Sequence, residues 1–126
     1  MRRAVNTGNA SIGSGPYSQG ILARGMLFVS GQGPLDAAGN IVAGDIEAET
    51  RMTMDNVKAI VEAAGFTMDD VVKVGVYLAD LQEFDRFNAV YETYFSAPLP
   101  ARTCVQAVLD NIKVEIDAIV CRDQEE

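Results

Sequence analysis

Apolar residues recur along the chain at two spacings, and each spacing predicts a different kind of element. Near the N-terminus two strand-like runs, residues 20–22 and 26–32, flank the turn signal Arg24-Gly25 and predict a hairpin. Residues 34–44 contain the sequence PLDAAGN and predict a loop. The first half of the chain therefore begins with a hairpin and continues into a loop.

Helical spacing then predicts two helices. Asp45 is placed to cap a helix that runs to Gly65, whose apolar residues share one face: Met54, Val57, Ile60, Val61 and Ala64. A second helix is predicted from Leu81 to about Phe95, with an apolar stripe made of Leu81, Phe84, Phe87, Tyr91 and Phe95. Asn88 lies four residues after Phe84 and therefore borders this stripe. A polar amide at that position needs a partner or a ligand.

Alternation of apolar and polar residues predicts strands in the rest of the chain. In VVKVGVYLAD the predicted buried side is formed by Val72, Val74, Val76 and Leu78. The segment ARTCVQAVLDNIKVEIDAIV is predicted to be a hairpin with a two-residue turn at Asp110-Asn111, which pairs Leu109 with Ile112, Ala107 with Val114 and Val105 with Ile116. That register places Arg102, Cys104 and Glu115 together on the polar face, which becomes a candidate site.

The order of these elements predicts an α+β fold. Two strands, a helix, a strand, a helix and two strands suit a mixed sheet with both helices packed on one face. At 126 residues the chain has the size of one domain, and we expect a single domain over residues 1–126. The chain itself leaves the other face of the sheet uncovered, so a partner subunit is the expected cover.

Composition narrows the class of protein. With 18 Asp and Glu against 10 Lys and Arg the net charge is −8, which argues against nucleic acid as a partner. No apolar run approaches the roughly 20 residues that span a bilayer, which argues against a membrane protein. The N-terminal residues lack the apolar segment of a secretory signal, and the expected location is the cytoplasm.

The chemistry available to the chain is limited. It has no histidine, the commonest general base and zinc ligand, and only two cysteines, Cys104 and Cys121. A metal site is not expected, and a reducing cytoplasm argues against a disulfide. Catalysis would have to use carboxylates, hydroxyls, a thiol, an arginine or backbone groups.

Each candidate residue has a structural and a functional interpretation. Arg102 would pair with an acid such as Asp117, or its planar fork would grip a substrate carboxylate. Glu115 would be a solvated strand residue or would hold or deprotonate a water beside a substrate. Cys104 would be a small buried residue, since no histidine is present to activate its thiol. Spacing alone leaves these alternatives open.

Two further segments contain candidate residues. VSGQGP ends a strand at Ser30 and Gly31, where the backbone can approach a ligand closely. GPYSQG is a turn by composition, in which Tyr17 has either a packing or a binding role.

Six segments, in this order, resemble the reactive intermediate/imine deaminase family, also known as RidA or YjgF. They span nearly the whole chain: GPYSQG, FVSGQGPLD, AETRMTMDNVKAIVEAAG, VVKVGVYLADLQEFDRFNAVYETYF, PARTCV and VEIDAIV. The resemblance implies a chorismate-mutase-like α+β fold and a homotrimer with sites in the clefts between subunits. It implies no cofactor.

The resemblance also implies roles for individual residues. Arg102 resembles the family's carboxylate-binding arginine, Glu115 the acid that orients the attacking water, and Cys104 the thiol beside the substrate. Tyr17, Ser30 and Asn88 are similar to further pocket residues.

The implied activity is hydrolysis of 2-imino acids, in equilibrium with their enamines, to 2-oxo acids and ammonia. The substrates would include 2-iminobutanoate and 2-iminopropanoate. One alternative is a non-catalytic trimer that binds small carboxylates and regulates a partner. A weaker alternative is an endoribonuclease, against which the acidic charge and the missing histidine argue.

Overall fold

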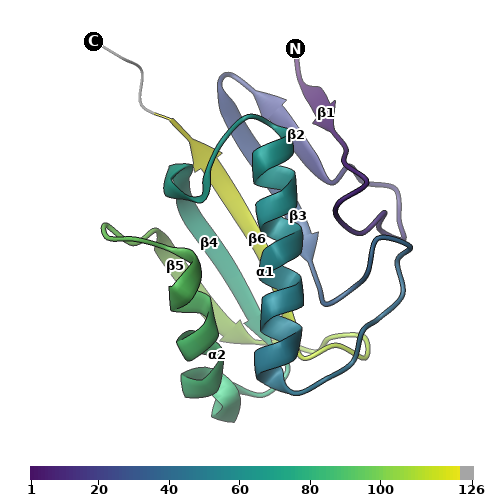
Figure 1. The fold of residues 1–126 in the computed structure, drawn as a ribbon, viewed down its shortest axis with the longest axis vertical. Coiled ribbons are helices and arrows are strands. Elements are labelled where there is room, and N and C mark those ends of the chain that lie inside the picture. Colours follow the sequence, from purple (N-terminus) through teal and green to yellow (C-terminus); the bar gives the residue numbers. More distant parts are fainter. Residues whose placement is uncertain (123–126) are drawn as a thin grey trace.

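The computed structural model of the chain describes residues 1–122 and contains one mixed β-sheet with two helices across the same face (Figure 1). Within these residues the sheet has six strands in the order β1-β2-β3-β6-β4-β5. The strands are β1 (Arg3–Val5), β2 (Gly20–Ala23), β3 (Met26–Gln32), β4 (Val71–Leu78), β5 (Ala101–Gln106) and β6 (Val114–Cys121). The helices are α1 (Ile46–Ala63) and α2 (Phe84–Tyr91), with short 3₁₀ turns η1 (Met68–Asp70), η2 (Leu81–Glu83) and η3 (Glu92–Tyr94). The predicted α+β architecture is confirmed.

The predicted N-terminal hairpin is present as β2 and β3. Arg24 and Gly25 both have positive φ, 54° and 75°, which is the backbone of a tight two-residue turn. The turn pairs Leu22 with Leu27 and Gly20 with Val29. Leu27 and Val29 are thereby placed under the helices, where both are buried.

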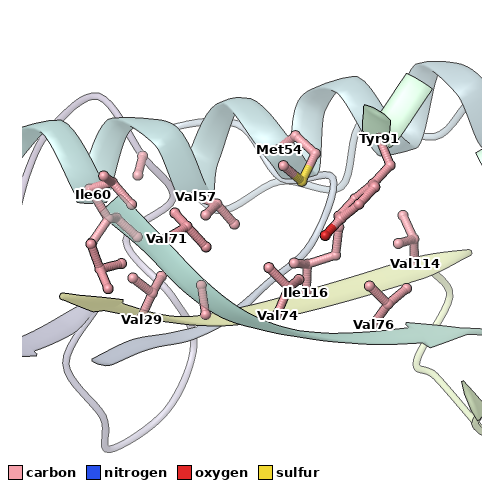
Figure 2. Close-up of a cluster of buried hydrophobic side chains, with 14 of the residues drawn as sticks. Val29, Met54, Val57, Ile60, Val71, Val74, Val76, Tyr91, Val114 and Ile116 are labelled. Carbon is pink, nitrogen blue, oxygen red and sulfur yellow. The ribbon is translucent and has the colours of Figure 1, made fainter. Parts of the chain in front are cut away.

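The first helix begins and ends where the sequence predicts. The Asp45 side chain accepts a hydrogen bond from the Ala48 N–H at 2.8 Å, and Gly65, just beyond the helix, has φ of 88°. In Figure 2 Met54, Val57 and Ile60 point from α1 toward the strands. All three are almost completely buried, so the predicted apolar face of α1 forms one side of the core.

A buried carboxylate fixes the beginning of β6. Glu49, on α1, is 1% exposed. Its side chain accepts hydrogen bonds from the backbone N–H of Lys113 at 2.8 Å and of Gly44 at 3.2 Å, and it lies 3.4 Å from the Lys113 ammonium. Because a buried carboxylate needs hydrogen-bond partners, these contacts fix Lys113, the residue directly before β6, at one position along α1.

The predicted C-terminal hairpin is wrong. β5 pairs in parallel with β4, while β6 runs antiparallel to both β3 and β4, so β4 lies between β5 and β6. Asn111 does adopt a turn conformation, with φ of 63°, but within the loop that connects two non-adjacent strands. The pairs predicted across Asp110-Asn111 therefore do not form.

This topology also corrects which side chains share a face. Arg102 and Ala118 both pair with Val74, a buried residue on the face covered by the helices. Glu115 pairs with Tyr77, which alternates with the buried positions and belongs to the open face. The prediction that Arg102, Cys104 and Glu115 project to the same side is therefore wrong: the arginine and the thiol lie on the helix side, and the carboxylate lies on the open side.

A bulge at the start of β4 corrects one core prediction. The pairing of β4 with β6 shifts between Val71 and Lys73. Val71 takes the buried position at 5% exposure, whereas Val72 is 45% exposed. The predictions for Val74, Val76 and Leu78 are confirmed, since each is at most 1% exposed.

Over the part of the chain that the structure describes, no helix is both long enough and apolar enough to cross a membrane.

Candidate active site

Arg102 lies on β5 against the aromatic side chains of α2. Its Nη1 donates a hydrogen bond of 2.7 Å to Asn88 Oδ1, and its guanidinium carbon is 4.9 Å from the centre of the Tyr91 ring and 5.5 Å from that of Phe84. Within residues 1–122 Arg102 forms no ion pair, and Asp117, its alternative partner from spacing, lies on the other face. A half-buried guanidinium therefore faces a neutral amide and aromatic rings.

A hollow of about 270 Å³ opens beside this guanidinium. It is lined by Asn88, Tyr91, Glu92, Leu99, Pro100 and Arg102. The sequence placed Tyr91 in an apolar stripe, and the structure shows that its ring also supports the arginine. A small molecule in this hollow would lie beside the guanidinium, whose planar fork suits two parallel hydrogen bonds to a carboxylate.

Cys104 shares the helix side with Arg102 and packs at the edge of the core. Burial raises the pKa of its thiol, and the nearby Arg102 charge lowers it by less. The thiol is therefore protonated near neutral pH, which makes it a weak nucleophile.

Glu115 lies half-buried on the open face and leans over Gly31 of β3. A Cβ atom on Gly31 would approach the Glu115 carboxyl carbon to 3.0 Å, so the glycine leaves room for that carboxylate. The pKa of Glu115 is raised, first by burial and then by the negative charge of Asp117. The sequence predicted that Gly31 lets backbone approach a ligand, whereas in the structure the space is taken by a side chain of the same chain.

Ser30 and Tyr17 lie near Gly31. The Ser30 hydroxyl donates to the Ser18 carbonyl at 2.5 Å, and the Tyr17 ring packs on Gly13 and Gly15 with 52% of its surface exposed. Tyr17 and Gly31 line a common hollow of about 50 Å³.

The side chain of Gln19 is buried and holds the loop that contains Tyr17. The apolar and polar pattern of the sequence does not indicate this role. The Gln19 amide donates to Thr7 O and Ser11 O at 3.1 and 2.7 Å. It also accepts from the Thr7 N–H at 2.7 Å. A glutamine in a turn gives no periodic signal, so only the fold reveals this role.

The sequence-predicted residues thus form two groups. Asn88, Arg102 and Cys104 form one group on the helix side near β5. Tyr17, Ser30, Gly31 and Glu115 form the other, on β3, β6 and the N-terminal loop. One copy of the chain does not bring the two groups together, because the sheet lies between the Arg102 and Glu115 side chains.

The two groups provide complementary chemistry. The first offers a cationic fork for a carboxylate, and the second offers a carboxylate with a raised pKa for proton transfer. Among residues 1–122 no group of three or more Cys, Asp or Glu side chains is arranged to hold a metal ion.

Comparisons with known proteins agree with one another. Residues 7–122 match the family described as Endoribonuclease L-PSP. The chain is 44% identical to a RutC family protein of Pyrococcus horikoshii, over 98% of this chain and 100% of the relative. It is 42% identical to the 2-iminobutanoate/2-iminopropanoate deaminase of Salmonella typhimurium, over 97% of this chain and 99% of the relative. The crystal structure of Escherichia coli TdcF with bound serine is similar with a TM-score of 0.89 and 38% identity, over 96% of this chain and 99% of that one.

These matches extend over almost all of the chain, in sequence and in fold, and they confirm the resemblance that its motifs indicated. The protein belongs to the L-PSP family, the family of the reactive intermediate/imine deaminases.

Proposed function

We propose that the protein hydrolyses 2-imino acids, such as 2-iminobutanoate and 2-iminopropanoate, to 2-oxo acids and ammonia. The observation that carries this proposal is Arg102, a half-buried guanidinium that bonds a neutral amide and borders a hollow of about 270 Å³. Such a group suits the carboxylate that these substrates share. Relatives that are 42% identical bear the name of this deaminase, which supports the assignment.

The reaction needs few functional groups. Glu115 takes a proton from a water while the water oxygen bonds to the carbon of the protonated imine, which gives a carbinolamine. The protonated Glu115 then gives that proton to the amino nitrogen. The C–N bond breaks and releases ammonia, which takes up the hydroxyl proton as the 2-oxo acid forms. Positioning by Arg102 and proton transfer by Glu115 are sufficient in principle for this hydrolysis.

In this proposal the active site forms between copies of the chain. The open face of the sheet contains the exposed side chains of Phe28 and Val105, which a second copy would cover. A homotrimer closes such head-to-tail contacts into a ring and can place Arg102 of one copy near Glu115 of the next. The site is incomplete without this assembly.

The activity is tested by generating 2-iminobutanoate and 2-iminopropanoate freshly in solution and measuring ammonia and 2-oxo acid with and without the protein. We expect release to be faster than the spontaneous hydrolysis. Equal rates in the two samples, with a folded and assembled protein, would refute the proposal.

Arg102→Ala and Glu115→Gln are each expected to inactivate the protein and to complement one another when produced together. In mixed trimers about a quarter of the clefts would combine an intact Arg102 with an intact Glu115, so about a quarter of the wild-type activity should return. Light scattering and native mass spectrometry check that the particles are trimers and contain both variants. Mixed trimers without activity, or a protein that is monomeric at micromolar concentration, would contradict the shared site.

Cys104→Ser is expected to retain most of the activity. The thiol is protonated because burial raises its pKa, and the proposed hydrolysis has no covalent step. Steady-state kinetics of the variant against wild type check this. A folded, assembled variant as inactive as Arg102→Ala would show that the thiol takes part in the chemistry.

A protein that only binds small carboxylates is the second candidate, because one relative was crystallised with bound serine. It would use Arg102 but would not need Glu115, and it would release no ammonia from the imines.

The family description names an endoribonuclease, yet the net charge of −8 disfavours approach to a phosphate backbone. A cytoplasmic location remains part of the proposal.

A further inference from the structure

A second carboxylate lies beside Glu115 on the open face. Asp117 is two residues further along β6, so its side chain projects from the same side of the strand. Glu115 leans over Gly31 of β3, and Asp117 leans over Gly75 of β4. A Cβ atom on Gly75 would come within 3.2 Å of the Asp117 carboxyl carbon, so a glycine makes room for each acid.

Tyr77 holds Asp117 in this position. The Tyr77 hydroxyl donates a hydrogen bond of 3.3 Å to Asp117 Oδ2. Within residues 1–122 neither Asp117 nor Glu115 forms an ion pair. The charge of Asp117 is therefore fixed near Glu115 and is not neutralised by a cation of the same chain.

Few other titratable groups face this pair. β4 contributes Tyr77 and Lys73 to this face. The Lys73 ammonium lies 3.4 Å from the Thr103 hydroxyl. β6 adds the Cys121 thiol, and the N-terminal loop adds Tyr17 beyond Gly31. β3 contributes only uncharged residues to this face, and in the proposed trimer Arg102 of a neighbouring copy would approach. Asp117 is thus the anion closest along the strand to Glu115.

The electrostatics agree with this geometry. After burial, the charge of Asp117 is the second cause of the raised pKa of Glu115. The same charge is the first cause of the raised pKa of Tyr77, so the phenol stays protonated and keeps its hydrogen bond.

We propose that Asp117, fixed over Gly75 by the Tyr77 hydroxyl, is a positioning residue that makes Glu115 a stronger base toward the attacking water. This inference rests on the proposed function and extends it to residues that need not touch the substrate. A group that takes up and returns a proton works best when its affinity for that proton matches the working pH. An ordinary carboxylate holds a proton too weakly near neutral pH, and a fixed neighbouring anion corrects this.

The test uses Asp117→Asn, which keeps size and shape, with Tyr77→Phe as a milder variant. Glu62→Gln is the matched control, because it removes one negative charge from an exposed position on α1, away from the open face. For each protein, kcat and kcat/KM are measured from acidic to neutral pH after subtraction of the spontaneous rate. The titration of the Glu115 carboxyl is followed in parallel by ¹³C NMR, with Glu115→Gln to assign its signal.

Loss of the Asp117 charge lowers the pKa of Glu115, so the acidic limb of kcat/KM should move to lower pH. At neutral pH kcat should fall roughly three- to tenfold, with KM nearly unchanged because Arg102 still holds the substrate. Tyr77→Phe should move the limb less, and the control should not move it. In ¹³C NMR the Glu115 midpoint should fall in Asp117→Asn.

The outcomes separate the two proposals. The role of Asp117 alone is overturned if the wild type hydrolyses imine but a folded Asp117→Asn leaves the acidic limb of kcat/KM unchanged. An unchanged midpoint of the Glu115 titration in ¹³C NMR has the same consequence. A wild type that releases no ammonia overturns the proposed function and this inference with it.

Discussion

Arg102→Lys is expected to lose imine hydrolysis nearly as completely as Arg102→Ala, with kcat/KM lower by on the order of a hundredfold or more. A lysine ammonium provides a point charge, whereas the guanidinium provides a planar fork. In the structure one arm of that fork already bonds Asn88, which fixes the plane of the group beside the hollow. Lysine cannot bond the amide and grip a carboxylate with two parallel bonds at once.

Arg86→Lys is the matched control for this prediction. Arg86 also makes a two-pronged contact with a carboxylate, at 2.7 and 3.0 Å from Glu47, but on the exposed surface. Its replacement should leave kcat/KM unchanged. Calorimetry with 2-oxobutanoate, a stable product, measures binding directly. If Arg102→Ala still binds this oxo acid like wild type, the assignment of the carboxylate site is wrong.

Glu115→Gln should bind 2-oxobutanoate but hydrolyse imine slowly, on the order of a hundredfold below wild type if general-base action is lost. Glutamine has nearly the same shape and should fit over Gly31, so fold and assembly should be preserved. It cannot accept and return a proton at neutral pH. The ammonia assay and calorimetry on the same sample separate the loss of chemistry from a loss of binding.

Two results would contradict this role of Glu115. One is a folded Glu115→Gln variant with wild-type kcat. The other is a variant that no longer binds the oxo acid, which would make Glu115 a binding residue. The binding-only hypothesis predicts that wild type itself gives no ammonia above the spontaneous rate.

Elements with local signals were predictable from the sequence. The Arg24-Gly25 turn, the Asp45 cap and the Gly65 stop each act through the backbone of a few neighbouring residues. The apolar face of α1 followed from its helical period. Such features need no knowledge of the rest of the fold, and the structure confirms them.

The C-terminal strands were not predictable in the same way. Asp110-Asn111 has the composition of a hairpin turn, and Asn111 has the positive φ of one, but alternation does not say which strands are neighbours. β4 inserts between β5 and β6 and pairs with both. A bulge, such as the one that exposes Val72, likewise changes the face of a residue without a signal in the local pattern.

The same limit applies to the candidate site. The sequence identified the kinds of side chain, and Asn88 was expected to need a partner, which the structure identifies as Arg102. It did not give the face of Arg102, because that depends on the parallel pairing of β5 with β4. The glycines under the two acids and the link from Tyr77 to Asp117 join residues far apart in the chain, so they are visible only in the folded structure.

The position of Arg102 and Glu115 on opposite faces of the sheet has a genetic consequence in the proposed trimer. Each copy contributes to two clefts, supplying the arginine to one and the carboxylate to the other. A chain that has lost both side chains but still assembles would silence two of the clefts around it, although its neighbours are intact. When a defective and a normal allele are expressed equally, about a quarter of the clefts would keep both side chains, so the activity would be about half of what the normal copies would give in trimers of their own.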